Sequence, residues 1–193
     1  MRVGLYGGTF DPIHLGHLRA AENAREELGL DLVAFVPAAL PPHRGAPVTA
    51  ARDRLAMVRL ATTPYAAFEA WDHELRREGP SYTIDTVEAL VAASPVDSFV
   101  LVVGSDTWPE IPSWREPERP LALVEVAVVD RPGHAQAQPV PPFPGARGAR
   151  RVGGPGLPLS ASAIREQARA GRSVRFLVPD AVLDYIGSRR LYR

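Results

Sequence analysis

The sequence of 193 residues contains no lysine and no cysteine, and all 22 of its basic residues are arginine. Without lysine there can be no Walker A phosphate loop, no Schiff base and no lysine nucleophile. Without cysteine there can be no disulfide, thiol nucleophile, Cys-ligated zinc or iron–sulfur cluster. These absences exclude several enzyme classes and favour a cytoplasmic protein.

The sequence also lacks an excess of charge and a long hydrophobic run. Its 22 basic residues balance 22 acidic ones, so no field of the whole molecule attracts nucleic acid, and any phosphate site must be local. No apolar run approaches the roughly 20 residues that span a bilayer, and the first residues do not resemble a signal peptide. We therefore expect neither a nucleic-acid nor a membrane partner, while an oligomer is compatible with the sequence.

Short apolar runs alternate with stretches of helical periodicity along the chain. The runs predict strands at 3–6, 32–36, 68–71, 99–103 and 124–129. The periodic stretches predict helices at 18–28, 50–60, 84–91 and 160–170, with a last helix starting near Pro179. This alternation is typical of parallel βαβ units. We predict one α/β domain over 1–193, a Rossmann-like doubly wound parallel sheet with a small helical C-terminal part.

The 20 prolines are about twice the usual share of roughly 5%. They gather in three segments, 37–47, 109–120 and 132–158, which we predict to be loops. The last of these, rich in both Pro and Gly, is expected to be a flexible surface loop within the single domain.

The stretch 7–17, GGTFDPIHLGH, lies where the first strand is expected to end and the first helix to begin. Ligands bind at the carboxyl ends of strands in open α/β sheets. Two glycines let the backbone approach a phosphate chain, and a helix N-terminus presents unpaired N–H groups. The stretch lacks the G-x-G-x-x-G pattern, which disfavours a dinucleotide redox cofactor.

His14 and His17 are three residues apart at the expected helix start, so they share one face. They could be metal ligands, but neither His43 nor His73 completes a recognisable ligand set. They could be ordinary capping and packing residues. We favour a pair of donors to a phosphate group that stabilise charge developing during phosphoryl or nucleotidyl transfer.

This stretch resembles the HxGH signature of the nucleotidyltransferase superfamily, and its fuller form resembles the bacterial nicotinate-nucleotide adenylyltransferases. The resemblance continues along nearly the whole chain, in PPHR at 41–44, SYTIDT at 81–86, GSD at 104–106, Trp114, RPG at 131–133, LSASAIR at 159–165 and LVPDAVLDYI at 177–186.

The resemblance implies transfer of AMP from ATP to nicotinate mononucleotide, giving nicotinate adenine dinucleotide and pyrophosphate in NAD biosynthesis. It implies catalytic roles for His14, His17 and Arg165 and Mg²⁺ carried mainly by the ATP phosphates, with no dedicated protein metal site. It places ATP at Gly7, Gly8, Thr9, Phe10, His17, Gly104, Asp106, Ser162, Ile164 and Arg165. It places the mononucleotide at Thr9, His43, Arg44, Tyr82, Thr83, Trp114 and Arg131.

Three of these positions also have plainer interpretations. Asp106 could accept a ribose hydroxyl or cap a helix, and Trp114 could stack on a pyridine ring or pack beneath a loop. Ser81 could simply be an N-cap, whereas the N–H groups and hydroxyl around Tyr82 and Thr83 could bind a carboxylate. Alternative functions are another HxGH transferase, acting on nicotinamide mononucleotide or phosphopantetheine, and a nucleotide-binding module without turnover.

Overall fold

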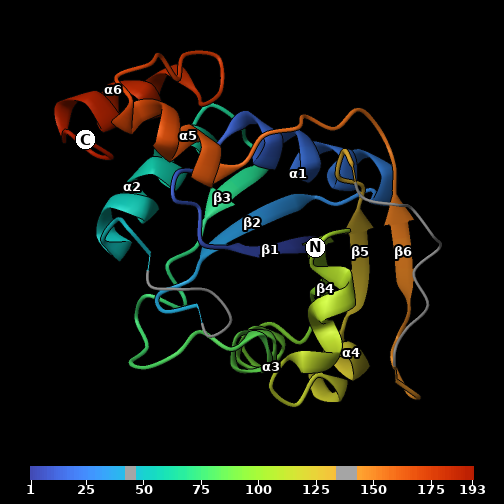
Figure 1. Ribbon diagram of the computed structural model, residues 1–193. Coiled ribbons are helices and arrows are strands. Elements are labelled where there is room, and N and C mark those ends of the chain that lie inside the picture. The colour runs from blue at the N-terminus through green and yellow to red at the C-terminus, as the bar shows by residue number, and fades with distance from the viewer. Residues whose placement is uncertain (42–46, 134–142) are drawn as a thin grey trace.

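The computed structural model describes residues 1–41, 47–133 and 143–193 and contains one parallel sheet covered by helices on both faces (Figure 1). The strands are β1 (Arg2–Gly8), β2 (Leu32–Pro37), β3 (Phe68–Ala70), β4 (Ser98–Gly104), β5 (Glu125–Val129) and β6 (Ala149–Val152). Their order in the sheet is β3-β2-β1-β4-β5-β6, and every neighbouring pair is parallel. The predicted doubly wound Rossmann-like sheet is confirmed.

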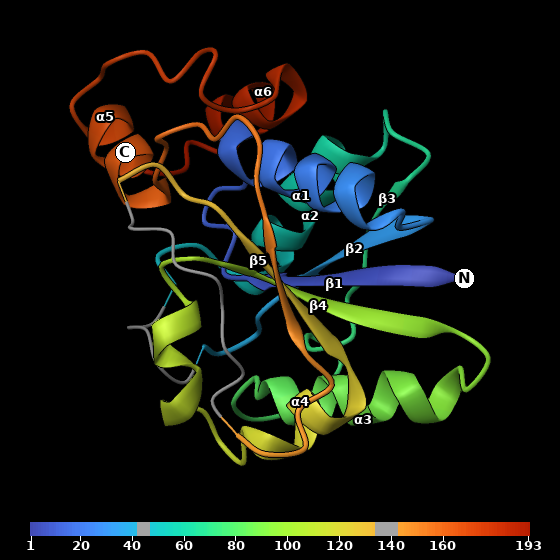
Figure 2. The same cartoon turned by 90° about the vertical axis from the view of Figure 1, so that its right-hand side faces the viewer.

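The helices divide into two layers. Viewed along the sheet in Figure 2, α3 (Thr83–Ala93) and α4 (Glu118–Leu123) cover one face. The opposite face carries α1 (Leu15–Leu28), α2 (Ala51–Thr62), α5 (Ala161–Arg169) and α6 (Asp180–Ser188). A short 3₁₀ helix, η1 (Trp108–Ser113), follows β4. None of the helices in the described part of the chain is both long and apolar enough to cross a bilayer.

The central strands are mostly apolar because both of their faces are buried. Along β4, Val100 and Val102 pack in the core beneath α1 and α2, whereas Phe99, Leu101 and Val103 pack in the core beneath α3. This alternation follows from the two-residue period of a strand. The two cores fix the sheet rigidly, so its carboxyl edge is a firm base for a site.

The structure differs from the sequence prediction in two proline-rich segments. Segment 109–120 is not only loop, because η1 and α4 lie in or across it. Pro109 and Pro120 lie in the first turns of these helices, where the missing N–H has no intrahelical partner, whereas Pro112 lies inside η1. Segment 132–158 contains the edge strand β6, in which only Val152 is buried. An edge strand with so few apolar residues gives almost no hydrophobic signal. Residues 134–142 of the predicted loop lie outside the described residues.

Candidate active site

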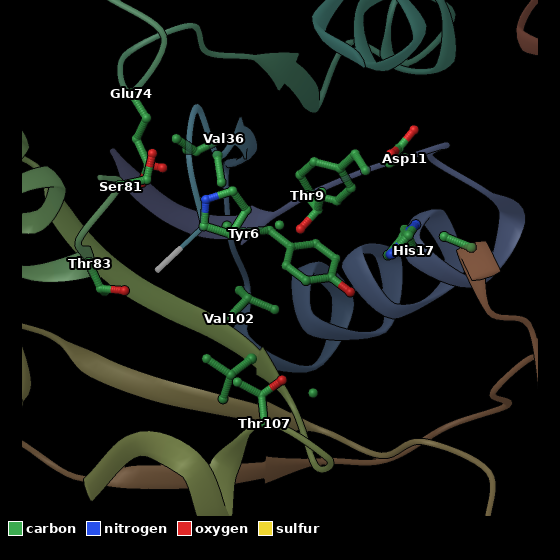
Figure 3. A pocket seen from close by; sticks show the side chains of 18 of the residues that line it. Tyr6, Thr9, Asp11, His17, Val36, Glu74, Ser81, Thr83, Val102 and Thr107 are labelled. Atoms are coloured by element: carbon green, nitrogen blue, oxygen red, sulfur yellow. The ribbon is translucent and has the colours of Figure 1, made fainter. Parts of the chain in front are cut away.

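A cavity of about 620 Å³ opens at the carboxyl ends of the central strands. It is lined by the end of β1 and the turn after it, by the first turn of α1, by the loop after β4, and by the starts of α3 and α5. Strand order changes direction between β1 and β4, the point at which open α/β sheets bind their ligands. Figure 3 shows Asp11 and His17 at one end of this cavity and Glu74, Ser81 and Thr83 at the other.

The two histidines lie in direct contact at the start of α1. Their rings stack with centroids 3.6 Å apart, and the backbone N–H of His14 donates to Nδ1 of His17 across 3.2 Å. Because Nδ1 of His17 accepts this hydrogen bond, the neutral ring carries its proton on Nε2. His17 therefore can offer a donor at Nε2 without being charged.

The His14 ring is buried, with 2% of the residue exposed. Burial, followed by the positive charge of Arg131, lowers the pKa of His14 to about 3. At neutral pH His14 is therefore an uncharged imidazole. Its buried Nδ1 forms no hydrogen bond with the described residues.

The turn after β1 packs an aromatic ring against His17. Phe10 adopts a left-handed backbone conformation, with φ of 49°, and its ring packs edge-on against His17 at 5.1 Å between centroids. Gly8 makes this fold possible, since a Cβ there would lie 2.8 Å from the Phe10 ring. Tyr6 adds a second edge-on contact to His17. The glycine of the motif thus allows an aromatic support for the histidine.

Arg165 reaches the same end of the cavity from α5. The N-cap of this helix is Ser160, whose Oγ accepts a hydrogen bond from the N–H of Ala163. Nη1 of Arg165 donates to the carbonyl of Asp11 across 2.7 Å, while its Nε is buried and makes no hydrogen bond within the described chain. The turn therefore orients the guanidinium, whose unsatisfied N–H is suited to an anionic ligand.

The carboxylate of Asp11 ties this turn to other parts of the chain. Oδ1 accepts a hydrogen bond from the Tyr192 hydroxyl at 2.7 Å, and Oδ2 accepts from the backbone N–H groups of Val48 and Thr49. A carboxylate that receives three hydrogen bonds has little freedom to move. The turn after β1 is consequently fixed by residues from outside the motif.

The loop after β4 places a carboxylate beside an arginine. Oδ1 of Asp106 lies 3.4 Å from Nε of Arg131, and a Cβ on Gly104 would overlap that carboxylate. Thr107, not Asp106, is the cap of the helix that follows. Asp106 is thus free of the capping role and is placed to accept a hydrogen bond from a sugar hydroxyl.

The other end of the cavity is formed by the start of α3. Tyr82 is the N-cap of α3 and makes no side-chain capping bond. Ser81 does not cap this helix; its Oγ accepts a hydrogen bond from the N–H of Ala39 across 2.8 Å. Trp114 and Thr83 line the cavity nearby, and the Arg115 guanidinium lies over the Tyr82 ring.

A buried acid lies behind these residues. Glu74 lines the cavity and accepts a hydrogen bond from the hydroxyl of Thr86 across 2.8 Å. Burial is the main cause that raises the pKa of Glu74 above its usual range. The hydroxyl of Thr86 is in turn contacted by Arg77.

Residues 5–167 match the family described as cytidylyltransferase-like. The chain belongs to this family. Among its relatives, the probable nicotinate-nucleotide adenylyltransferase of Symbiobacterium thermophilum is 46% identical over 197 residues, covering 99% of this chain and 95% of that protein. The probable nicotinate-nucleotide adenylyltransferase of Pseudomonas fluorescens is 42% identical and covers 100% of this chain and 97% of its own length.

Solved structures with the same fold include the nicotinic acid mononucleotide adenylyltransferase of Plasmodium falciparum complexed with NaAD. It superposes with a TM-score of 0.83 at 19% identity and covers 99% of this chain and 97% of that one. The same parasite enzyme complexed with APC gives a TM-score of 0.81. At this identity the likeness shows the family fold alone.

The cavity brings together most of the site residues that the sequence predicted. Those lining it are Gly7, Gly8, Thr9, Phe10, His14, His17, Tyr82, Thr83, Gly104, Asp106, Trp114, Arg131, Ser162 and Arg165. Ile164 is not among the lining residues, because its side chain is 1% exposed and packs in the core beneath α1 and α2. His43 and Arg44 lie outside the described residues.

Four polar residues around the cavity are missing from the sequence prediction. Asp11 belongs to the motif at 7–17 and could have been singled out there, whereas Glu74 lies outside every motif of the sequence analysis. Arg54 and Tyr192 give no such signal, since each resembles an ordinary helix or surface residue in sequence. Their contacts with the turn after β1 depend on the folded arrangement.

Proposed function

We propose that this chain is a nicotinate-nucleotide adenylyltransferase, which transfers AMP from ATP to nicotinate mononucleotide in NAD biosynthesis. A phosphate oxygen of the mononucleotide attacks the α-phosphorus of ATP, and the bond to the β-phosphate oxygen breaks. The products are nicotinate adenine dinucleotide and pyrophosphate. The full-length similarity to relatives of that name supports the assignment, together with a cavity of about 620 Å³ at the carboxyl ends of the strands.

The nucleophile is already an anion at neutral pH, so the reaction needs no strong general base. Catalysis then depends on holding the reactants in line and on stabilising charge on the transferring group. Nε2–H of His17 supplies a neutral donor, and His14 holds that ring through the backbone bond and the stack. Arg165 adds a fixed positive charge at the phosphates.

The mononucleotide lies toward the start of α3. The free N–H groups there and the Thr83 hydroxyl bind the nicotinate carboxylate, because a helix N-terminus favours an anion. Trp114 stacks on the pyridine ring. Asp106 and Arg131, which also line the cavity, contact sugar and phosphate groups.

Mg²⁺ enters this site on the phosphates of ATP. No group of three His, Asp or Glu residues suited to a metal ion occurs in the segments that the structure describes. The Asp11 carboxylate already receives three hydrogen bonds, and Asp106 faces Arg131. Mg²⁺ commonly binds through substrate phosphates with few protein ligands, and this arrangement fits that mode.

The stacked histidine pair facing the end of β1 is the single observation that best carries the proposal. The test is pyrophosphate release from ATP and Mg²⁺ with nicotinate mononucleotide, nicotinamide mononucleotide or phosphopantetheine as acceptor. We expect release that depends on the acceptor and is fastest with nicotinate mononucleotide. Preference for another acceptor would assign a different transferase activity, and tight ATP binding without release would indicate a binding module.

A further inference from the structure

Arg54 of α2 is the largest side chain in the described structure that is essentially fully buried, with 1% of the residue exposed. Its guanidinium donates three hydrogen bonds, all to backbone carbonyls: Nη1 to Thr9 at 2.8 Å, Nη2 to Ala39 at 3.2 Å and Nε to Thr49 at 3.2 Å. The five N–H groups of an arginine make a planar fork that can reach several acceptors at once. One side chain therefore connects three separate segments of backbone.

A buried cation of this kind is costly for stability. Its three acceptors are neutral carbonyls, and a well-packed apolar side chain of similar size is often as stabilising as a buried charge, or more so. Burial lowers the pKa of Arg54, and the negative charge of Asp11 opposes that effect only in part. Stability alone therefore does not account for an arginine at this position.

Two of the three carbonyls, those of Thr9 and Ala39, lie just beyond the point where the pairing of β1 and β2 ends. β1 and β2 pair in parallel as far as Gly8 and Pro37, and the N–H of Ala38 donates to the carbonyl of Gly8. Thr9 and Ala39 are the next residues on the two segments. Arg54 thus bridges the chains where their direct hydrogen bonding ends.

Beyond this bridge the two segments lead to opposite ends of the cavity. Thr9 begins the turn that supports the histidine pair, and it is labelled in Figure 3. Ala39 is held on its other side by Ser81, which directly precedes the start of α3. Any change in the separation of Thr9 and Ala39 would move one substrate site relative to the other.

We propose that Arg54 is a positioning residue that fixes the spacing between the ATP site and the mononucleotide site. It does so through its bonds to the carbonyls of Thr9 and Ala39. This inference rests on the proposed function. In-line attack needs the phosphate of the mononucleotide to lie close to the α-phosphate of ATP and in line with the bond that breaks. Each substrate alone can still bind to its own side of the cavity.

The test compares Arg54→Met and Arg54→Lys with Met57→Ala. Met57 is equally buried on the same helix, but its side chain donates no hydrogen bond, so its truncation lowers the melting temperature without removing the bridge. Rates are measured well below the melting temperature of each variant and divided by the folded fraction. Lysine keeps the charge but lacks the planar fork, so both Arg54 variants should lose the bridge.

We expect kcat to fall by about tenfold to a hundredfold in both Arg54 variants, with each KM changing by less than about threefold. Met57→Ala should keep kcat per folded molecule. Equal kcat in Arg54→Met and Met57→Ala would overturn the proposal, as would a rise in one KM with normal kcat. If Arg54→Met does not fold, Arg54→Lys alone decides. Absence of turnover in the unmutated protein would instead refute the proposed function.

Discussion

The two ends of the cavity are held by different means. At the end that we propose for ATP, one short stretch supplies the turn, its aromatic support and both histidines, and Arg165 is the main addition from a distant helix. At the end that we propose for the mononucleotide, the contributing residues come from the loop after β2, the segment before α3 and η1. The first end is a local motif, and the second is an assembly that exists only in the folded chain.

The ends also bury titratable groups of opposite kinds. His14 has a lowered pKa and Glu74 a raised one, and burial is the largest cause of both shifts. Burial disfavours the charged form of each group. At neutral pH the cavity therefore contains an uncharged imidazole, that of His14, beside the charged side chains of Arg165 and Arg131.

The largest effect that we expect is that of His17→Ala, which removes the imidazole donor from the end of the cavity that we propose for ATP. Loss of a donor aimed at charge that develops during transfer should lower kcat by roughly a hundredfold or more. The KM for ATP should change little, because the interaction strengthens mainly in the transition state. Steady-state pyrophosphate release with varied ATP measures both constants.

His73→Ala is the control for that substitution, because this half-buried histidine is not among the residues that line the cavity. It should keep near-normal kcat. A His17→Ala enzyme that also keeps near-normal kcat would remove the donor role assigned to the pair.

Thr83→Val sharpens the comparison at the mononucleotide end. Loss of one hydrogen bond to a charged group costs about 1.5 to 3 kcal/mol, or roughly ten- to a hundredfold in kcat/KM. The loss should appear with nicotinate mononucleotide and barely with the nicotinamide form, which lacks the carboxylate. Thr63→Val, at an exposed position outside the cavity, should change neither value. An unchanged ratio between the two substrates in Thr83→Val would contradict carboxylate recognition by this residue.

Trp114→Ala should affect both mononucleotides equally. Stacking of a ring on an aromatic side chain is worth about 1 to 3 kcal/mol, so we expect each mononucleotide KM to rise by about tenfold. The KM for ATP should stay the same. Trp71→Ala is the matched control, since Trp71 is also half-buried but hydrogen-bonds to Glu69 away from the cavity lining. A rise in the KM for ATP alone would contradict the proposed stacking of Trp114 on the mononucleotide.

The same contrast explains how far the sequence could predict the molecule. The first five strands and most of the helices follow from apolar periodicity, and the histidine pair follows from a motif within eleven residues. The sequence did not predict β6, because an edge strand with two adjacent arginines carries no hydrophobic pattern. The histidine pair is therefore predictable from local sequence, whereas predicted residues such as Thr83, Trp114 and Arg165 rest on the family resemblance.

Arg54 and Glu74 could not be assigned in this way. Their partners are backbone groups and hydroxyls that lie between 5 and 45 residues away in the chain. Neither residue type has a spacing rule for such contacts, and an arginine on a helix is usually solvated. Only the folded arrangement reveals that these two side chains are buried beside the cavity.

The smallest expected effect concerns stability against pH, and its sign differs between the two ends. The folded pKa of His14, about 3, is below its unfolded value, so the unfolded chain binds the extra proton. The stability that His14 contributes is present above about pH 6.5 and is lost as pH falls toward 3. Between pH 6 and pH 5 the loss should be about 1 kcal/mol. Urea unfolding of the unmutated protein and His14→Gln measures it, and the variant should lack that part of the decline.

Glu74 should act in the opposite direction, because its folded pKa is raised. Its favourable contribution is present below about pH 4.5, the unfolded value, and is lost as pH rises through the folded pKa. Glu74→Gln keeps an oxygen acceptor for the Thr86 hydroxyl but cannot ionise. Relative to that of the unmutated protein, the free energy of unfolding of this variant should therefore increase as pH rises from 4 to 7. If the stabilities of both variants instead deviate in the same direction with pH, burial is not the cause of the two pKa shifts. The contrast between the ends of the cavity then rests on their hydrogen bonds alone.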